Sequence, residues 1–342
     1  MNRRSEYLDF CKGILIILVV AGHMIQVGSG ASYVQHESFY DNIIYKIIYS
    51  FHMPFFMAIS GFLYYFTTTK YSGYCIFLKK IKSIFVPIVS WSIVCSLIKY
   101  AQNLTSVNYI KVFFVDFLLN NWFLWAILYL SLAVYLLERL AKYLNISDLY
   151  IYIFSVILTF FTPTILNFYM YSYLLPFFWG AFLINKYGII SKLINNDSLK
   201  TMGVCSFIIY VTLFMFWNRD AYIYTSHLSI FTKNGILLHQ LYVDIYRYLV
   251  GFFGTTLFSI IFYYLCKRFR YVIVVELGKQ TIGIYIISCI LNLFIETLFC
   301  SFVHTFNLVW LILETVMVLF VSYYFTILID KNNITRSLFL GR

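Results

Sequence analysis

The amino-acid sequence predicts an all-α, polytopic integral membrane protein, a bundle of about ten transmembrane helices with both termini in the cytoplasm. Three observations lead to this fold class. Of the 342 residues, 62% are hydrophobic and only 11% are charged, a balance that excludes an ordinary water-soluble domain. Apolar stretches of about 20 residues, the length that crosses a bilayer, follow one another along the chain. Basic residues gather in alternate connections between them.

The apolar stretches predict ten spans separated by short polar gaps, so that one transmembrane domain covers residues 1–342. The first run has no small-residue cleavage site, and we interpret it as a retained signal anchor. In chain order, we expect the spans at residues 10–28, 43–66, 83–101, 112–137, 150–167, 171–186, 199–217, 244–265, 280–303 and 307–329.

The basic residues predict the orientation of the bundle. Most of the 25 lysines and arginines fall on one side if the N-terminus is inside, as the positive-inside rule requires for an even number of spans. The net charge of +11 is scattered over short loops and forms no basic stripe, so we expect no nucleic-acid partner. Residue usage resembles that of an AT-rich bacterial genome. We therefore expect a multi-pass protein of the bacterial cytoplasmic (inner) membrane, embedded in its lipid bilayer.

The first span carries the candidate catalytic residue His23 and the candidate basic residue Lys12. These residues are eleven positions apart, close to three helical turns, so they share one helix face with His23 about 16 Å deeper. An ionisable group at that depth is costly and marks a functional site by default. Asp9, one turn before Lys12, is a supporting candidate. The alternative for His23 is a neutral side chain hydrogen-bonded to a neighbouring helix.

The second span adds a second imidazole, His52, two residues before Pro54. Two buried histidines on adjacent helices favour a functional site more strongly than one. Ser60, further along the span, is a supporting candidate, and Gly61 predicts a close helix contact.

A basic cluster, Lys79-Lys80-Ile81-Lys82, stands directly before the third span. Such a cluster is typical of a topology signal or of a contact with anionic lipids. It can equally bind the phosphates of a nucleotide-bearing donor, and Lys79, Lys80 and Lys82 are therefore candidate donor-binding residues.

The later spans offer weaker candidates. Trp122 and Trp125 lie in the fourth span, and we interpret them as anchors of that span, with sugar stacking as the alternative. The longest outer connection, 218–243, reads as an amphipathic surface loop that could also cap an outward-facing cavity. The last two spans each carry one carboxylate, Glu296 and Glu314, which we expect to face the bundle interior. Interhelical hydrogen bonding is their simplest role, and binding of an acceptor hydroxyl is the alternative.

Several enzyme classes lack their motifs in this chain. No GxSxG, HExxH or P-loop pattern occurs, which argues against serine hydrolases, zinc proteases and ATPases. The seven cysteines form no CxxC pair, and we expect neither a metal site nor a disulfide. A transporter or flippase for a lipid-linked sugar or small anion would also explain buried histidines, although the chain shows no internal repeat.

The segment from Arg4 through LDFCKGILIILVVAGH to His23 resembles the signature of the acyltransferase-3 family of membrane O-acyltransferases. Each motif alone is weak, but several in the family's order are a strong signal. The further matches are FHMPFFMAISGFL at 51–63, the lysine cluster ahead of FVPIVSW, NNWFLWAILYL at 120–130, LLPFFWGAFLI at 174–184 and LGKQTIGIYIIS at 277–288.

The resemblance implies transfer of an acyl group, usually acetyl, from cytoplasmic acyl-CoA to a hydroxyl of a cell-surface or lipid-linked saccharide. Acetyl-CoA is then a co-substrate, and no resident cofactor is expected. By position, His23 would be the essential histidine, Lys12 its basic companion, and Lys79 and Lys82 the basic pair near the donor entrance.

Two positions depart from the family pattern. Relatives often have arginine where this chain has Lys12, Lys79 and Lys82, and lysine lacks the planar, bidentate fork of a guanidinium. Ser288 stands where many relatives have a histidine. The sequence leaves open whether His23 acts as a general base or carries the acyl group, which saccharide is modified, and the oligomeric state.

Overall fold

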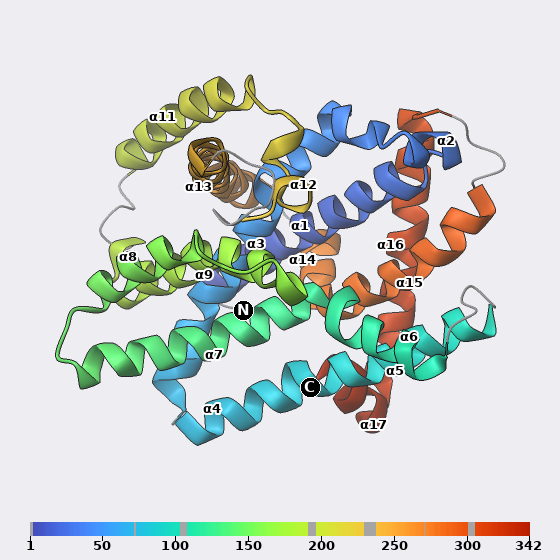
Figure 1. Cartoon of the computed structure of the whole chain (residues 1–342), viewed down its shortest axis with the longest axis horizontal. Coiled ribbons are helices and arrows are strands. Elements are labelled where there is room, and N and C mark those ends of the chain that lie inside the picture. The colour runs from blue at the N-terminus through green and yellow to red at the C-terminus, as the bar shows by residue number, and fades with distance from the viewer. Residues whose placement is uncertain are drawn as a thin grey trace. The chain divides into compact units, whose positions relative to one another are not determined.

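A computed structural model describes residues 3–71, 73–102, 108–190, 196–228, 237–269, 271–299 and 305–342. Within these ranges the chain is helical and contains no strand, which confirms the predicted all-α class (Figure 1). The chain divides into two compact units. The first comprises Met1–His52 and Leu257–Arg336, and the second comprises Met53–Thr256 and Ser337–Arg342.

The first unit is built around the long N-terminal helix α1, which packs against α14, α15 and α16. Helices α3 and α13 each contribute one end to this unit. Its elements are α1 (Arg3–Val27), α2 (Ala31–Gln35), η1 (Ser38–Asp41), the start of α3 (Ile43–Lys70), the end of α13 (Leu237–Arg268), α14 (Val272–Lys279), α15 (Thr281–Phe299), α16 (Leu308–Lys331) and α17 (Asn333–Thr335).

The second unit holds the middle of the chain and a short segment from its end. Within it, α7 packs against α8 and α9, and α5 packs against α6. Its elements are the rest of α3 and α13, α4 (Gly73–Lys80), η2 (Ile81–Phe85), α5 (Val86–Ala101), α6 (Tyr109–Val115), η3 (Asp116–Asn120), α7 (Trp122–Tyr143), α8 (Asp148–Thr159), η4 (Ile165–Asn167), α9 (Phe168–Lys186), α11 (Asn196–Phe214), η5 (Arg219–Ala221), α12 (Ile223–Ser226) and η6 (Arg336–Leu340).

The helices suit a multi-pass membrane protein. Among the described residues, α14 and α15 together form a span bent by 82°, which would be an eighth. The span predicted at 150–167 only overlaps α8, which has 12 residues and ends at Thr159, and the span predicted at 171–186 lies within α9, which has 19 residues. Ten spans and cytoplasmic termini therefore stay predictions. The seven helices that are long and apolar enough by themselves are Glu6–Val27, Ile43–Lys70, Gly73–Ala101, Trp122–Tyr143, Asp197–Phe214, Leu238–Arg268 and Leu308–Lys331.

Glycines set the closest helix contacts in both units. In the first unit, a Cβ on Gly13 would lie 1.9 Å from the carbonyl oxygen of Val274, and one on Gly278 would lie 1.7 Å from that of Asp9. In the second, a Cβ on Gly61 would lie 1.8 Å from the carbonyl oxygen of Phe178, as the close contact predicted for Gly61 requires. These contacts bring sequence motifs together in pairs, α1 with α14 and α3 with α9.

Candidate active site

The two candidate histidines lie in the first unit, where α1 crosses α3. A Cβ on Gly22 would be 3.1 Å from the ring of Tyr49, so the helices approach closely one residue before His23. The Tyr49 ring also packs edge-on against His52, with centroids 4.9 Å apart. The predicted pairing of His23 with His52 therefore has a structural basis in a glycine crossing.

His52 is held in one tautomer by its own helix. Its Nδ1 lies 2.7 Å from the carbonyl oxygen of Ile48, one turn earlier, and the ring is buried. A carbonyl oxygen only accepts, so Nδ1 carries the proton in this contact and Nε2 keeps its lone pair. His52 thus presents a hydrogen-bond acceptor from its far side.

His23 is held less firmly. Its imidazole is half-buried and makes no hydrogen bond with another described residue. The two residues that follow it, Met24 and Ile25, are fully buried. A fixed helix with an uncommitted imidazole is the arrangement that a general base or nucleophile needs, because the ring nitrogen has to be open to substrate.

The opposite end of α1 carries the charged candidates of this unit. The Lys12 ammonium lies 2.7 Å from Asp9 Oδ1, and both side chains are partly exposed. Because α1 is one unbroken helix, Lys12 and His23 are separated by about 16 Å of rise, as predicted. Lys279, which we did not select from the sequence, follows the Gly278 contact with Asp9 and pairs with Glu276 at 2.5 Å.

Of the two carboxylates predicted to face the bundle interior, the structure describes the side chain of Glu314 but not that of Glu296. Glu314 on α16 is 3% exposed, and a Cβ on Gly28 would lie 2.2 Å from its Oε2. Its Oε1 accepts no hydrogen bond from the described residues. Glu314 therefore faces the interior of its unit, beside the last turn of α1. Glu296 belongs to α15, but its side chain lies outside the described residues.

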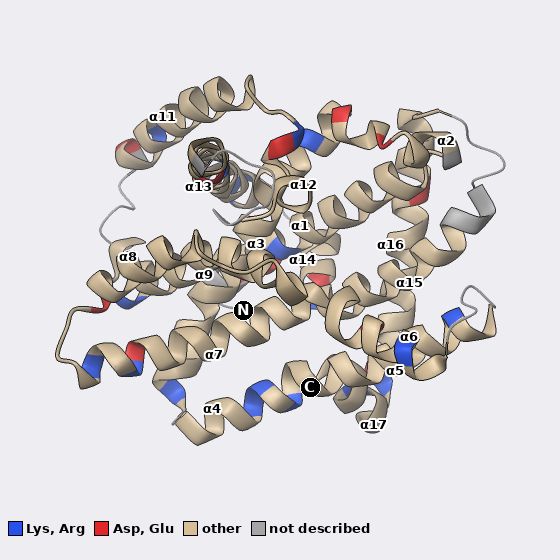
Figure 2. Ribbon diagram, viewed as in Figure 1, with Lys and Arg blue, Asp and Glu red and all other residues tan. Residues whose placement is uncertain are grey.

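The candidate lysines lie in the second unit, on the last turn of α4 and the π-helical turn η2. Figure 2 shows α4 with basic and no acidic residues. The Lys79 ammonium sits 3.3 Å from the ring centroid of Tyr71, and its hydrogen bond lowers the pKa of the Tyr71 phenol. Lys80 lies 4.8 Å from the Tyr64 ring and is half-buried, whereas Lys79 and Lys82 are exposed. The positions of Lys79 and Lys82, three residues apart, put both on one face.

Two serines named in the sequence analysis form hydrogen bonds with backbone carbonyls of their own helices. Ser60 Oγ donates to the carbonyl oxygen of Phe56 at 2.9 Å, and Ser288 Oγ donates to that of Tyr285 at 2.7 Å. Such bonds to the preceding turn satisfy a hydroxyl within an apolar helix. They give Ser60 a structural role, and its supporting role in chemistry stays a prediction.

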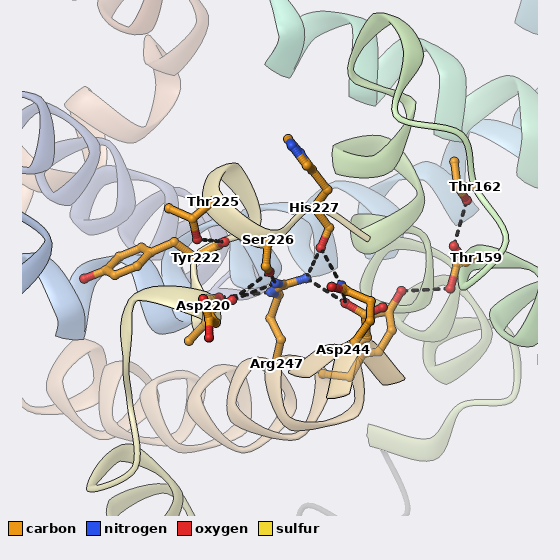
Figure 3. Close-up of polar contacts among 12 residues, drawn as sticks. Thr159, Thr162, Asp220, Tyr222, Thr225, Ser226, His227, Asp244 and Arg247 are labelled. Atoms are coloured by element: carbon orange, nitrogen blue, oxygen red, sulfur yellow. Dashed lines mark hydrogen bonds and ion pairs between the residues drawn. The ribbon is translucent and has the colours of Figure 1, made fainter. Parts of the chain in front are cut away.

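A buried cationic centre that was not predicted from the sequence lies in the second unit, around Arg247 of α13 (Figure 3). The guanidinium is 2% exposed and donates to the carbonyl oxygens of Ala221 at 2.9 Å, His227 at 2.8 Å and Asp220 at 3.0 Å. It also pairs with Asp244 at 3.1 Å. One side chain thereby contacts both ends of the 219–227 connection, at Asp220 and Ala221 and at His227.

His227 is the end point of this anchored connection. Its φ of 60° is in the left-handed region, and its ring packs edge-on against Tyr169 at 4.6 Å. Burial, and then the nearby charge of Arg247, lower the pKa of His227. The 218–243 connection is thus fixed at its first half by Arg247, while residues 229–236, Lys233 among them, lie outside the described part.

Comparisons with known proteins agree with the resemblance found in the motifs. A sequence model of the family described as "Acyltransferase domain" matches residues 5–328. A "Nodulation protein NolL" of Sinorhizobium fredii (strain NBRC 101917 / NGR234) is 29% identical over 305 residues, covering 84% of this chain and 78% of the relative. A second, from Mesorhizobium japonicum (strain LMG 29417 / CECT 9101 / MAFF 303099), is 25% identical over 305 residues, covering 84% and 76%. No solved structure matches the chain.

Proposed function

The chain belongs to the acyltransferase family whose model matches residues 5–328, and from that premise we propose that it O-acylates a saccharide with acyl-CoA as donor. The acyl group is acetyl, and the acceptor is a hydroxyl of a cell-surface or lipid-linked glycan. The protein works in the bacterial inner membrane. The observation that carries the proposal is the pair of imidazoles near the crossing of α1 and α3. The His52 ring is hydrogen-bonded to the Ile48 carbonyl, and the His23 ring makes no hydrogen bond with another described residue.

On the general-base route, His23 transfers one proton. Neutral His23 removes the proton from the acceptor hydroxyl as its oxygen attacks the thioester carbonyl. The carbon–sulfur bond then breaks, and the imidazolium returns the proton to the departing thiolate, giving the ester and free CoA. No group outside donor, acceptor and imidazole is required for this balance.

His52 has a positioning role in this proposal. Its Nδ1–H is committed to the Ile48 carbonyl, so its Nε2 can accept a hydrogen bond from the N–H of His23 or from the acceptor hydroxyl. The bond from His23 would fix which of its nitrogens is free, as the orienting residue of a catalytic triad does, and the bond from the hydroxyl would position the acceptor.

The acyl-imidazole route uses the same residue in a different way. His23 would attack the thioester, release CoA and carry the acyl group until the acceptor arrives. The two routes differ in whether the acyl group becomes covalently attached to the protein. Incubation with [¹⁴C]acetyl-CoA and no acceptor labels the protein on the covalent route and leaves it unlabelled on the general-base route, with His23→Ala as the unlabelled control for either.

The donor's phosphates are assigned to the lysine turn, defined here as Lys79, Lys80 and Lys82. Lys79 and Lys82 are exposed on one face and can each give a point charge to a phosphate. Lys80 is half-buried over Tyr64 and steadies the turn. Lys12 of the first unit, paired with Asp9, stays a predicted donor-binding residue.

The test of the proposed function is product formation by the purified full chain. Detergent-solubilised protein is incubated with acetyl-CoA and a panel of bacterial glycans, and CoA release is followed with a thiol reagent. We expect acceptor-dependent release together with a glycan that gains the mass of one acetyl group. Absence of CoA release with every acceptor, from protein that remains folded and monodisperse, would contradict the proposal.

A further inference from the structure

The segment Ser337–Arg342 packs onto the second unit beside the lysine turn. The indole N–H of Trp91 on α5 donates to the carbonyl oxygen of Phe339 at 2.9 Å. The rings of the same two residues pack edge-on with centroids 5.0 Å apart. Leu340 is only 2% exposed. A hydrogen bond, an aromatic contact and a buried leucine therefore fix the segment on α5.

The contact closest to the lysines is made by Gly341. Its φ of +67° is a conformation that other residues rarely adopt, and a Cβ there would lie 2.3 Å from the carbonyl oxygen of Ser83. Ser83 belongs to the π-helical turn η2, which ends two residues before Pro87. Gly341 thus lies directly against the backbone of this turn.

This packing brings Arg342 near Lys82. Gly341 contacts Ser83, and Arg342 and Lys82 are the chain neighbours of these two residues. Because neighbouring Cα atoms are about 3.8 Å apart, the Cα atoms of Arg342 and Lys82 lie within about 12 Å of each other. Both side chains are exposed. Two long cationic side chains at this separation can reach one phosphate group.

We propose that Arg342 completes the phosphate-binding part of the acyl-CoA donor site, and that residues 337–341 position it there. The inference rests on the proposed function, in which the lysine turn binds the donor's phosphates. Lysines bind phosphate as point charges, whereas a guanidinium donates two parallel hydrogen bonds in a fixed plane. Arg342 adds that bidentate donor to the lysine turn from a distant part of the sequence.

The experiment compares two donors that share one thioester. Acetyl-CoA carries phosphates, and S-acetylpantetheine carries none. For Arg342→Gln we expect the KM for acetyl-CoA to rise about tenfold with kcat unchanged, since a charge-assisted hydrogen bond is lost. We expect kcat/KM for S-acetylpantetheine to stay at the wild-type value, and Arg342→Lys to recover part of the acetyl-CoA affinity. Lys200→Gln, which removes an exposed charge on α11, is the matched control.

A backbone variant tests the positioning part separately. Gly341→Ala keeps every charge but places a Cβ against the Ser83 carbonyl, and we expect the same rise in the KM for acetyl-CoA. If Lys79→Ala with Lys82→Ala raises that KM while Arg342→Gln and Gly341→Ala do not, the inference is wrong and the proposed function stands. An equal loss with S-acetylpantetheine would also overturn the inference. Wild-type protein that releases free thiol from neither donor, CoA from acetyl-CoA or pantetheine from S-acetylpantetheine, would overturn both.

Discussion

His23 and His52 differ in their hydrogen bonds, and the roles that we propose for them rest on that difference. His52 is buried and bonded to the Ile48 carbonyl, while His23 is half-buried and uncommitted. The glycine at position 22 lets Tyr49 lie against α1 beside them. A residue that must move protons needs a free ring nitrogen, and a residue that orients it needs a fixed one.

His52→Ala tests this assignment at the scale of a residue. We expect kcat to fall roughly 100-fold, with the KM for acetyl-CoA unchanged, because an orienting contact is lost and donor binding is not. Steady-state kinetics of CoA release measure both constants. Thr68→Ala removes a hydroxyl that is bonded to the Tyr65 carbonyl of the same helix and serves as the control. Normal turnover by His52→Ala would contradict the positioning role proposed for His52.

His227 gives a pH prediction. Burial and then Arg247 hold its pKa below 6.5 in the folded protein, so the unfolded chain binds more protons at mildly acidic pH. The stability that neutral His227 contributes is therefore present above about pH 6.5 and is lost as pH falls below it. We expect hydrogen exchange of residues 219–226, corrected for intrinsic rates, to accelerate between about pH 7 and pH 5.

The control for this effect is His227→Gln, which does not titrate. It should remove the pH dependence of exchange in η5 and α12 and leave that of α11 unchanged. An identical pH response in wild type and His227→Gln would show that another group governs the loosening of this connection.

At the scale of elements, Arg247 acts as the anchor of a connection that has little regular structure. Its guanidinium binds three backbone carbonyls and Asp244 within a buried site. Lysine could not replace it, because a single ammonium lacks the fork that reaches several acceptors. The short elements η5 and α12 therefore depend on one α13 side chain.

Arg247→Met should lower the free energy of unfolding by about 3–5 kcal/mol, because it leaves Asp244 buried and uncompensated. The double variant Arg247→Met with Asp244→Leu should be less destabilised than Arg247→Met alone, since no isolated charge remains. Denaturant unfolding in detergent measures both. A double variant less stable than the single one would mean that Asp244 still stabilises the fold without Arg247, where it accepts a hydrogen bond from Gln240, and would contradict the cost assigned to its buried charge.

Two glycines of the second unit give a matched test of helix packing. Gly61→Ala puts a Cβ 1.8 Å from the Phe178 carbonyl oxygen, which the backbone of α9 cannot avoid. We expect a lower melting temperature and a poor yield of folded protein. Gly180→Ala puts its Cβ 3.1 Å from the Tyr152 hydroxyl, which can move, and should be tolerated. Equal stability of the two variants would contradict the α3–α9 contact.

At the scale of the whole molecule, the sequence predicted what depends on composition and local spacing. Hydropathy predicted helices along the whole chain, and the unbroken helix α1 preserves the predicted face shared by Lys12 and His23. The close contact of Gly61 was predictable because small residues mark helix interfaces in apolar segments. The identification of the family came from the order of motifs.

The sequence did not predict features that depend on distant partners. Arg247 looked like one more basic residue, because its carbonyl partners lie 20 to 27 positions earlier and carbonyls have no sequence signature. The break between α14 and α15 lies at the start of the span predicted at 280–303, and hydropathy does not show that α14 precedes it at an angle of 82°. The packing of Gly341 on Ser83 joins segments too far apart for any local pattern to connect them.

The central claim is that His23 performs acyl transfer from acyl-CoA. The most direct test compares acetyl-CoA turnover by purified wild-type protein and by His23→Ala, in the presence of the acceptor glycan and with matched folding in detergent. We predict CoA release by the wild type and a loss of at least about 100-fold in kcat for the variant, with acetyl-CoA binding retained. Turnover by His23→Ala at the wild-type rate would contradict the account.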